Sequence, residues 1–136
     1  MQDRPPGVFV VATCNDVGSL SPGFMRRGRF DEIFFVDLPD VGEREAIVRV
    51  QLGRRKREPD AFDVTAIAAA TDGFAGAEIE GAIVAALYRA FADRSELSTD
   101  TILWEAGATT PLSRTRAEEI AALRSWAAGR ATPASA

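Results

Sequence analysis

The chain has 136 residues, of which 46% are hydrophobic and 26% charged, a balance typical of a folded globular protein rather than a disordered one. The net charge of −4 argues against a general nucleic-acid binder, the single cysteine excludes an internal disulfide, and the lack of histidine leaves a zinc site almost without ligands. The N-terminus does not resemble a signal peptide and no apolar run is long enough to span a bilayer, so we expect a soluble, cytoplasmic protein.

The first forty residues contain two short apolar runs that are typical of strands. Residues 8–12 are rich in β-branched side chains, as in a strand buried on both faces of a parallel sheet. Ser21 and Pro22 mark the start of a short helix, and residues 32–38 form the second predicted strand. Two strands without neighbours make a marginal sheet, so we expect them to pair between chains in a strand-exchanged oligomer, or to be disordered.

From Val41 onwards the apolar pattern is helical. It predicts helices over residues 43–56, 63–70, 76–91, 98–106 and 111–128, with Asp63 and Ser98 as caps. The predicted apolar face of the first of these helices consists of Ala46, Ile47, Val50 and Leu52. Residues after Gly129 are expected to fray. The predicted fold class is therefore mostly α, with a helical part preceded by a two-strand α/β remnant.

Two polar features of the first forty residues could take part in chemistry. Asn15 follows the first predicted strand, at the edge where open α/β sheets bind ligands, and its amide could hold a water or a phosphate oxygen. Arg26, Arg27 and Arg29 surround Gly28, and guanidinium groups suit phosphate. The plainer alternatives are a structural loop asparagine and a solvated arginine loop.

Two features of the helical part are similarly open. Gly76 and Ala77 begin the longest predicted helix, where small side chains let a ligand approach backbone N–H groups. Alternatively, Gly76 is a simple cap and Ala77 a close contact between helices. The basic cluster 54–57 is interpreted as a solvated helix end, with a nucleic-acid patch as the alternative.

Four stretches, in this order and spacing, resemble the second half of an AAA ATPase module. They are V-F-V-V-A-T-C-N-D, S-P-G-F-M-R-R-G-R-F-D-E-I-F-F-V-D-L-P-D, R-E-A-I-V-R-V and T-D-G-F-A-G-A-E-I-E. The resemblance covers about residues 8–95. The P-L-S-R-T stretch and the last helix are similar to a subgroup of stand-alone AAA proteins of cyanobacteria and plastids.

The resemblance implies a role for particular residues. Asn15 matches the sensor-1 asparagine, which helps to place the water that attacks the γ-phosphate. Arg26 and Arg29 match the two arginine fingers, which reach the nucleotide of the adjacent protomer, whereas Arg27 falls where the family often has proline or phenylalanine and receives no role. Gly76 and Ala77 match the sensor-2 region, where small residues contact the nucleotide.

The resemblance also implies how the chain is organised. Residues 1–40 match the end of the large α/β subdomain, 41–108 the helical lid, and 109–136 a C-terminal helix and tail. Gln51 aligns with a position near the adenine that is often histidine in this family. Glutamine can still form hydrogen bonds there, so adenine contact is retained in principle.

The sequence contains no G-x-x-x-x-G-K-[ST] loop and no apolar run that ends in paired acids. These elements hold the phosphates and Mg²⁺ and activate water. We therefore expect a piece cut from a longer ATP-hydrolysing remodelling machine, with Met1 either a vector residue or a chosen start, and expect the piece to be inactive alone. The parent would use ATP with Mg²⁺, form a homo-hexamer and remodel a protein substrate, while the piece would bind no cofactor tightly.

Two other functions remain open from the sequence. One is a non-enzymatic helical module that binds a partner protein. The other, weaker alternative is an arginine-rich nucleic-acid binder that uses residues 26–29 and 54–57, for which binding would depend steeply on salt. Neither a membrane nor a metal ion is expected as a partner.

Overall fold

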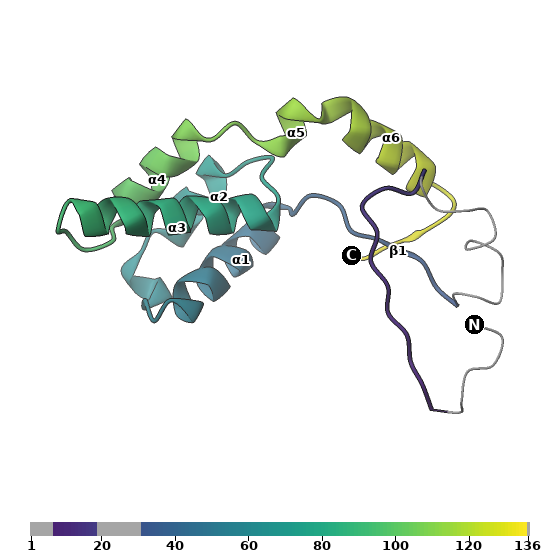
Figure 1. Ribbon diagram of the computed structural model, residues 1–136, viewed down its shortest axis with the longest axis horizontal. Helices are drawn as coiled ribbons and strands as arrows, with labels where there is room; N and C mark the ends of the chain where they lie inside the picture. The colour runs from purple at the N-terminus through teal and green to yellow at the C-terminus, as the bar shows by residue number, and fades with distance from the viewer. Residues whose placement is uncertain (1–6, 19–30, 136) are drawn as a thin grey trace. The chain divides into compact units, whose positions relative to one another are not determined.

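A computed structural model describes residues 7–18 and 31–135 of the chain (Figure 1). The chain divides into two compact units, one of Leu38–Ile120 and the other of Met1–Asp37 with Ala121–Ala136. The helix start predicted at Ser21 lies outside the described residues.

The larger unit is helical, as the sequence predicts. Its elements are α1 (Val41–Arg54), the 3₁₀ turn η1 (Pro59–Ala61), α2 (Val64–Ala70), α3 (Gly76–Ala92), α4 (Thr99–Ala108), α5 (Leu112–Thr115) and the first part of α6 (Ala117–Ala127). The predicted caps are confirmed, because Asp63 accepts a hydrogen bond from the Ala66 N–H at 2.9 Å and Ser98 accepts one from the Thr101 N–H at 3.2 Å. The single helix predicted over 111–128 is wrong, since Arg116 separates α5 from α6.

The core of this unit lies between α1, α2, α3 and α4. Helix α3 packs against α1 and α4, and α2 packs against the same two helices. The buried apolar residues at the centre are Val48, Leu52, Val64, Ile67, Phe74, Ile79, Ile83, Ala86, Leu97 and Ile102. This packing fixes the position of the start of α3 relative to α1.

The inward face of α1 differs from the predicted one. Val50 is 52% exposed and Ala46 is also exposed, so neither belongs to the core. The buried positions of α1 are Arg44, Val48, Gln51 and Leu52. Their spacing is the i, i+4, i+7, i+8 stripe of an amphipathic helix, which the prediction missed because two of its members are polar.

The smaller unit contains a two-stranded parallel sheet. In it β1 (Phe34–Phe35) pairs with β2 (Thr132–Pro133), with Phe34 opposite Thr132. The strand predicted over 32–38 is thus shorter than expected. Its partner is the tail after Gly129, so the prediction that this tail frays is wrong.

The strand predicted at 8–12 does not form. These residues are extended but belong to no strand, and Phe9 is 89% and Val11 76% exposed. A strand needs a neighbour to receive its backbone hydrogen bonds, and residues 8–12 belong to neither strand of the β1–β2 sheet. The fold class is nevertheless confirmed, because the described chain is mostly α with a small strand remnant.

Candidate functional site

The start of α3 meets α1 at a corner that contains two of the predicted site residues. Gly76 is the first residue of α3, and a Cβ atom built on it would lie 3.6 Å from Cδ1 of Ile47 in α1. Gln51 lies one turn further along α1 and is only 8% exposed. Ile47 and Gln51 also line a shallow groove of about 230 Å³ on α1, together with Ala46, Val50 and Arg54.

Neither structural explanation considered for Gly76 and Ala77 holds. The cap of α3 is Ala75 rather than Gly76, and Ala77 is exposed, so it is not a close contact between helices. The 3.6 Å distance from a Cβ at Gly76 to Ile47 is an ordinary van der Waals contact, so packing does not require glycine there. Small side chains at this helix start are therefore not explained by packing among the described residues.

The Gln51 side chain is part of a chain of polar contacts between α1 and α3. Its Oε1 accepts a hydrogen bond from Arg55 at 2.7 Å, and the other terminal nitrogen of Arg55 pairs with Glu80 of α3 at 2.8 Å. These contacts fix the rotamer of Gln51 and use its carbonyl oxygen. None of them uses the amide NH₂ of Gln51, which is the group that could donate to a ligand.

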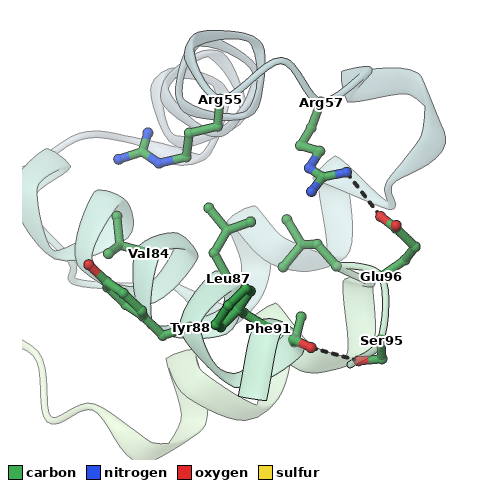
Figure 2. Close-up of a pocket in the computed structure, with 10 residues that line it drawn as sticks. Arg55, Arg57, Val84, Leu87, Tyr88, Phe91, Ser95 and Glu96 are labelled. Atoms are coloured by element: carbon green, nitrogen blue, oxygen red, sulfur yellow. Dashed lines mark hydrogen bonds and ion pairs between the residues drawn. The ribbon is translucent and has the colours of Figure 1, made fainter. Parts of the chain in front are cut away.

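The basic cluster 54–57 is more engaged than a solvated helix end. Arg55 has a side-chain exposure of only 19%, which corrects the prediction for this residue. Arg57 pairs with Glu96 at 3.0 Å. Both arginines line a groove of about 620 Å³, together with Tyr88 and Phe91 of α3. Figure 2 shows these side chains around it. Because two of the four cations are already paired, less charge is available to a nucleic acid.

The other predicted site residues do not belong to this corner. Asn15 is exposed in the smaller unit and follows no strand, while the neighbouring Asp16 accepts a hydrogen bond from the Gly18 N–H at 2.8 Å. Arg26, Arg29 and Arg27 lie outside the described residues. Among the described residues, the structure places Ile47, which shares a groove with Gln51, against the start of α3.

A buried arginine that the sequence pattern did not indicate, Arg44, joins the start of α1 to the end of α2. Arg44 donates to the carbonyl of Ala68 at 2.9 Å and to that of Pro39 at 3.0 Å, and it pairs with Asp72 at 3.2 Å. Its side chain is 9% exposed. The signal that could have found it is its place in the buried stripe of α1, four residues before Val48.

A second missed residue, Glu78, connects the start of α3 to the segment after α4. Its Oε2 accepts from the Ala75 N–H at 2.8 Å, and its Oε1 accepts from the Leu112 N–H at 2.8 Å. The preceding Pro111 is buried. From sequence alone, residues from Pro111 are predicted only as a terminal helix, because a hydrogen bond across 34 residues has no local signal.

Comparison with known proteins supplies relatives in two groups. The AAA domain-containing protein ycf46 of Pyropia yezoensis is 40% identical over 137 residues, covering 99% of this chain and 28% of the relative. That of Guillardia theta is 40% identical over 128 residues, covering 93% of this chain and 25% of the relative. The ATP-dependent zinc metalloprotease FtsH 2 of Petrotoga mobilis is 38% identical over 99 residues, covering 72% of this chain and 16% of the relative.

No family model matches the chain, and no solved structure does. The relatives, together with the mostly α fold and its strand remnant, identify the class: the chain belongs to the AAA ATPases and corresponds to the C-terminal part of their module. Among these relatives, the ycf46 protein of Pyropia yezoensis matches nearly the whole of this chain, including almost all residues after Pro111. The chain spans about a quarter of the length of these relatives, 28% and 25%. Among the described residues no helix has the length and apolarity needed to cross a membrane.

Proposed function

We propose that this chain is the nucleotide-sensing portion of an ATP-hydrolysing AAA machine that remodels proteins, and that it does not hydrolyse ATP alone. The observation that carries the proposal is the corner where Ile47 of α1, which lines a groove together with Gln51, meets Gly76 of α3. Small residues, an apolar wall and one oriented amide are the features expected of a site that receives a purine base.

The corner supports a specific division of roles. Ile47 supplies apolar surface for the face of the adenine, and the NH₂ of Gln51 donates to a ring nitrogen. The first N–H groups of α3, at Gly76 and Ala77, face a ligand without interference from side chains. Helices α1 to α4 then act as the lid that closes on the nucleotide.

The remaining roles follow from the family resemblance. Asn15 acts as sensor 1, and Arg26 and Arg29 act as fingers on the nucleotide of a neighbouring protomer in a hexameric ring. A finger arginine contributes on the order of 10³–10⁵ in rate, because phosphoryl transfer depends on neutralising charge. Mg²⁺, a phosphate-binding loop and paired acids, which this sequence does not contain, complete the site in the whole protein.

The first test compares ATP turnover by the complete gene product with that of the 136-residue chain. We expect turnover only in the former, and Arg29→Ala should abolish most of it. If the reading frame begins at Met1 and the product shows no turnover, the enzyme assignment fails.

A sharper test uses two glycines of α3. Gly76→Ala places a methyl group where we propose that the nucleotide approaches, yet its nearest neighbour leaves room at 3.6 Å. We expect KM for ATP to rise roughly tenfold with no loss of thermal stability, since alanine favours helix. Gly81→Ala is the matched control, because nothing lies within 4 Å of its Cβ, and it should leave KM unchanged. Equal KM values for both variants would contradict the proposed contact.

The groove in Figure 2 favours a second candidate, a non-enzymatic module that binds a partner protein. Phe91 is 84% and Tyr88 73% exposed there, and exposed aromatic residues that gather in one place often mark interaction sites. The turnover test above separates the two, because a binding module has no ATPase activity in its complete form.

A further inference from the structure

We infer that residues 111–113 form a strap that holds the turn at the start of α3 in its nucleotide-contacting position, with Glu78 as the positioning residue. The inference rests on the proposed function, and it assigns a task to a segment outside the four helices that build the core. The strap is defined here as Pro111, Leu112 and Ser113.

The carboxylate of Glu78 joins the strap to the turn. One oxygen accepts from Ala75, the residue that precedes Gly76, and the other accepts from Leu112, both at 2.8 Å. The bond to Leu112 uses a donor that helix α5 does not need, because the N–H groups of a helix's first residues have no partner within that helix. Each oxygen of Glu78 thus has a separate task, one within α3 and one on the strap.

The strap also contacts the turn at a second point, where Ser113 lies against Gly73. Gly73 has a φ of +75°, in the left-handed region that residues other than glycine rarely adopt. A Cβ atom built on Gly73 would also overlap the Ser113 hydroxyl. Pro111 is buried. The turn between Gly73 and Gly76 therefore packs against the strap at Gly73 and leads directly into α3 at Gly76.

Two glycines within four residues make this turn easy to deform once its outer contact is lost. While the strap is in place, the N–H groups of Gly76 and Ala77 keep the positions from which we propose that they contact nucleotide. Release of the strap should weaken nucleotide binding without changing the chemical step, because no strap residue contacts the phosphates in this proposal.

A pair of substitutions at one position isolates the bond to Glu78. Leu112→Pro removes the N–H, and the backbone accepts proline there: Leu112 is the first residue of α5, and Pro111 has φ −68° and ψ 148°, the extended conformation required before proline. Leu112→Ala is the matched control, since it removes the side chain and keeps the N–H.

The experiment measures KM and kcat for ATP in the complete gene product, and hydrogen exchange over residues 73–78. For Leu112→Pro we expect exchange to accelerate and KM to rise about 3- to 10-fold, as the loss of one hydrogen bond would cause, with kcat within about twofold of the parent value. Leu112→Ala should leave hydrogen exchange, KM and kcat unchanged.

Other outcomes separate this inference from the proposed function. Unchanged exchange in Leu112→Pro means that the strap does not hold the turn. Faster exchange with unchanged KM, in a protein where Gly76→Ala does raise KM, overturns the strap and leaves the nucleotide site standing. If Gly76→Ala also leaves KM unchanged, both the strap's task and the site are wrong.

Discussion

Two stretches of similar apolar character differ completely in solvent exposure. Residues 8–12 are all apolar and all exposed, whereas Ile79, Ile83 and Ala86 of α3 are completely buried. A helix forms its backbone hydrogen bonds within itself and needs only an apolar surface to pack on. A strand needs a neighbouring strand for its backbone as well, and among the described residues 8–12 have none.

The stability of the chain therefore comes mainly from the helical unit. The helical unit has a continuous core, to which α1, α2, α3 and α4 all contribute. The smaller unit has a sheet of two residues per strand, which is marginal in water on its own. Substitutions should therefore cost most at buried positions of the helical unit and least in the smaller unit, whatever the size of the side chain.

The largest effect is expected from Ile83→Ala. Ile83 is 0% exposed at the centre of the core, so its truncation leaves a cavity and should lower the free energy of unfolding by about 2–5 kcal/mol. Phe91→Ala in the same helix removes a larger side chain that is 84% exposed, and should cost less than about 0.5 kcal/mol. Urea unfolding of the 136-residue chain followed by circular dichroism measures both. Equal effects would mean that burial within the helical unit does not set the cost of a substitution.

An intermediate effect is expected from Arg44→Met, which keeps the aliphatic part of the side chain and removes the guanidinium. The carbonyls of Ala68 and Pro39 then lose a charged donor, at a cost of about 1–3 kcal/mol. The matched control is Arg49→Met in the same helix. The side chain of Arg49 is 51% exposed and pairs with Asp60 at the surface, so we expect about 0–1 kcal/mol. If the control costs as much as Arg44→Met, burial is not the cause.

These differences also show which parts of the structure the sequence could predict. The caps Asp63 and Ser98 were found because a cap bonds to a backbone N–H three residues later, so its signal is local. The bounds of α2, α3 and α4 follow from the same kind of pattern. The inward face of α1 was predicted wrongly at Val50, because the pattern assumes that buried positions are apolar and Arg44 and Gln51 are not.

Features that depend on distant partners were missed. The pairing of β1 with residues 132–133 and the bond from Leu112 to Glu78 join segments far apart in the chain, and nothing in the local composition indicates either. The candidate site was found through family resemblance at Gln51 and Gly76. What the structure adds is that Ile47, which lines a groove with Gln51, lies against Gly76, and that this contact does not require glycine there.

A small effect is expected within the smaller unit, at the ion pair between Arg124 of α6 and Asp37. Nε of Arg124 lies 3.0 and 2.8 Å from the two carboxylate oxygens. This hydrogen bond to Asp37 raises the pKa of Arg124 above its ordinary value, although partial burial opposes the rise. A raised pKa means that the stabilisation is complete below the ordinary pKa of arginine and is lost only in strong alkali. Stability from Arg124 should therefore not change between about pH 6 and 9.

Both side chains of this pair are partly exposed, 51% for Arg124 and 42% for Asp37, so solvent screens the attraction. A double-mutant cycle with Arg124→Ala and Asp37→Ala should give a coupling of about 0.2–1 kcal/mol. In 1 M salt, where the screening length falls to about 3 Å, most of that coupling should disappear. A coupling as large as the loss in Ile83→Ala would mean that charge, rather than apolar burial, sets the stability of the smaller unit. The contrast between the two units would then be one of mechanism and not only of magnitude.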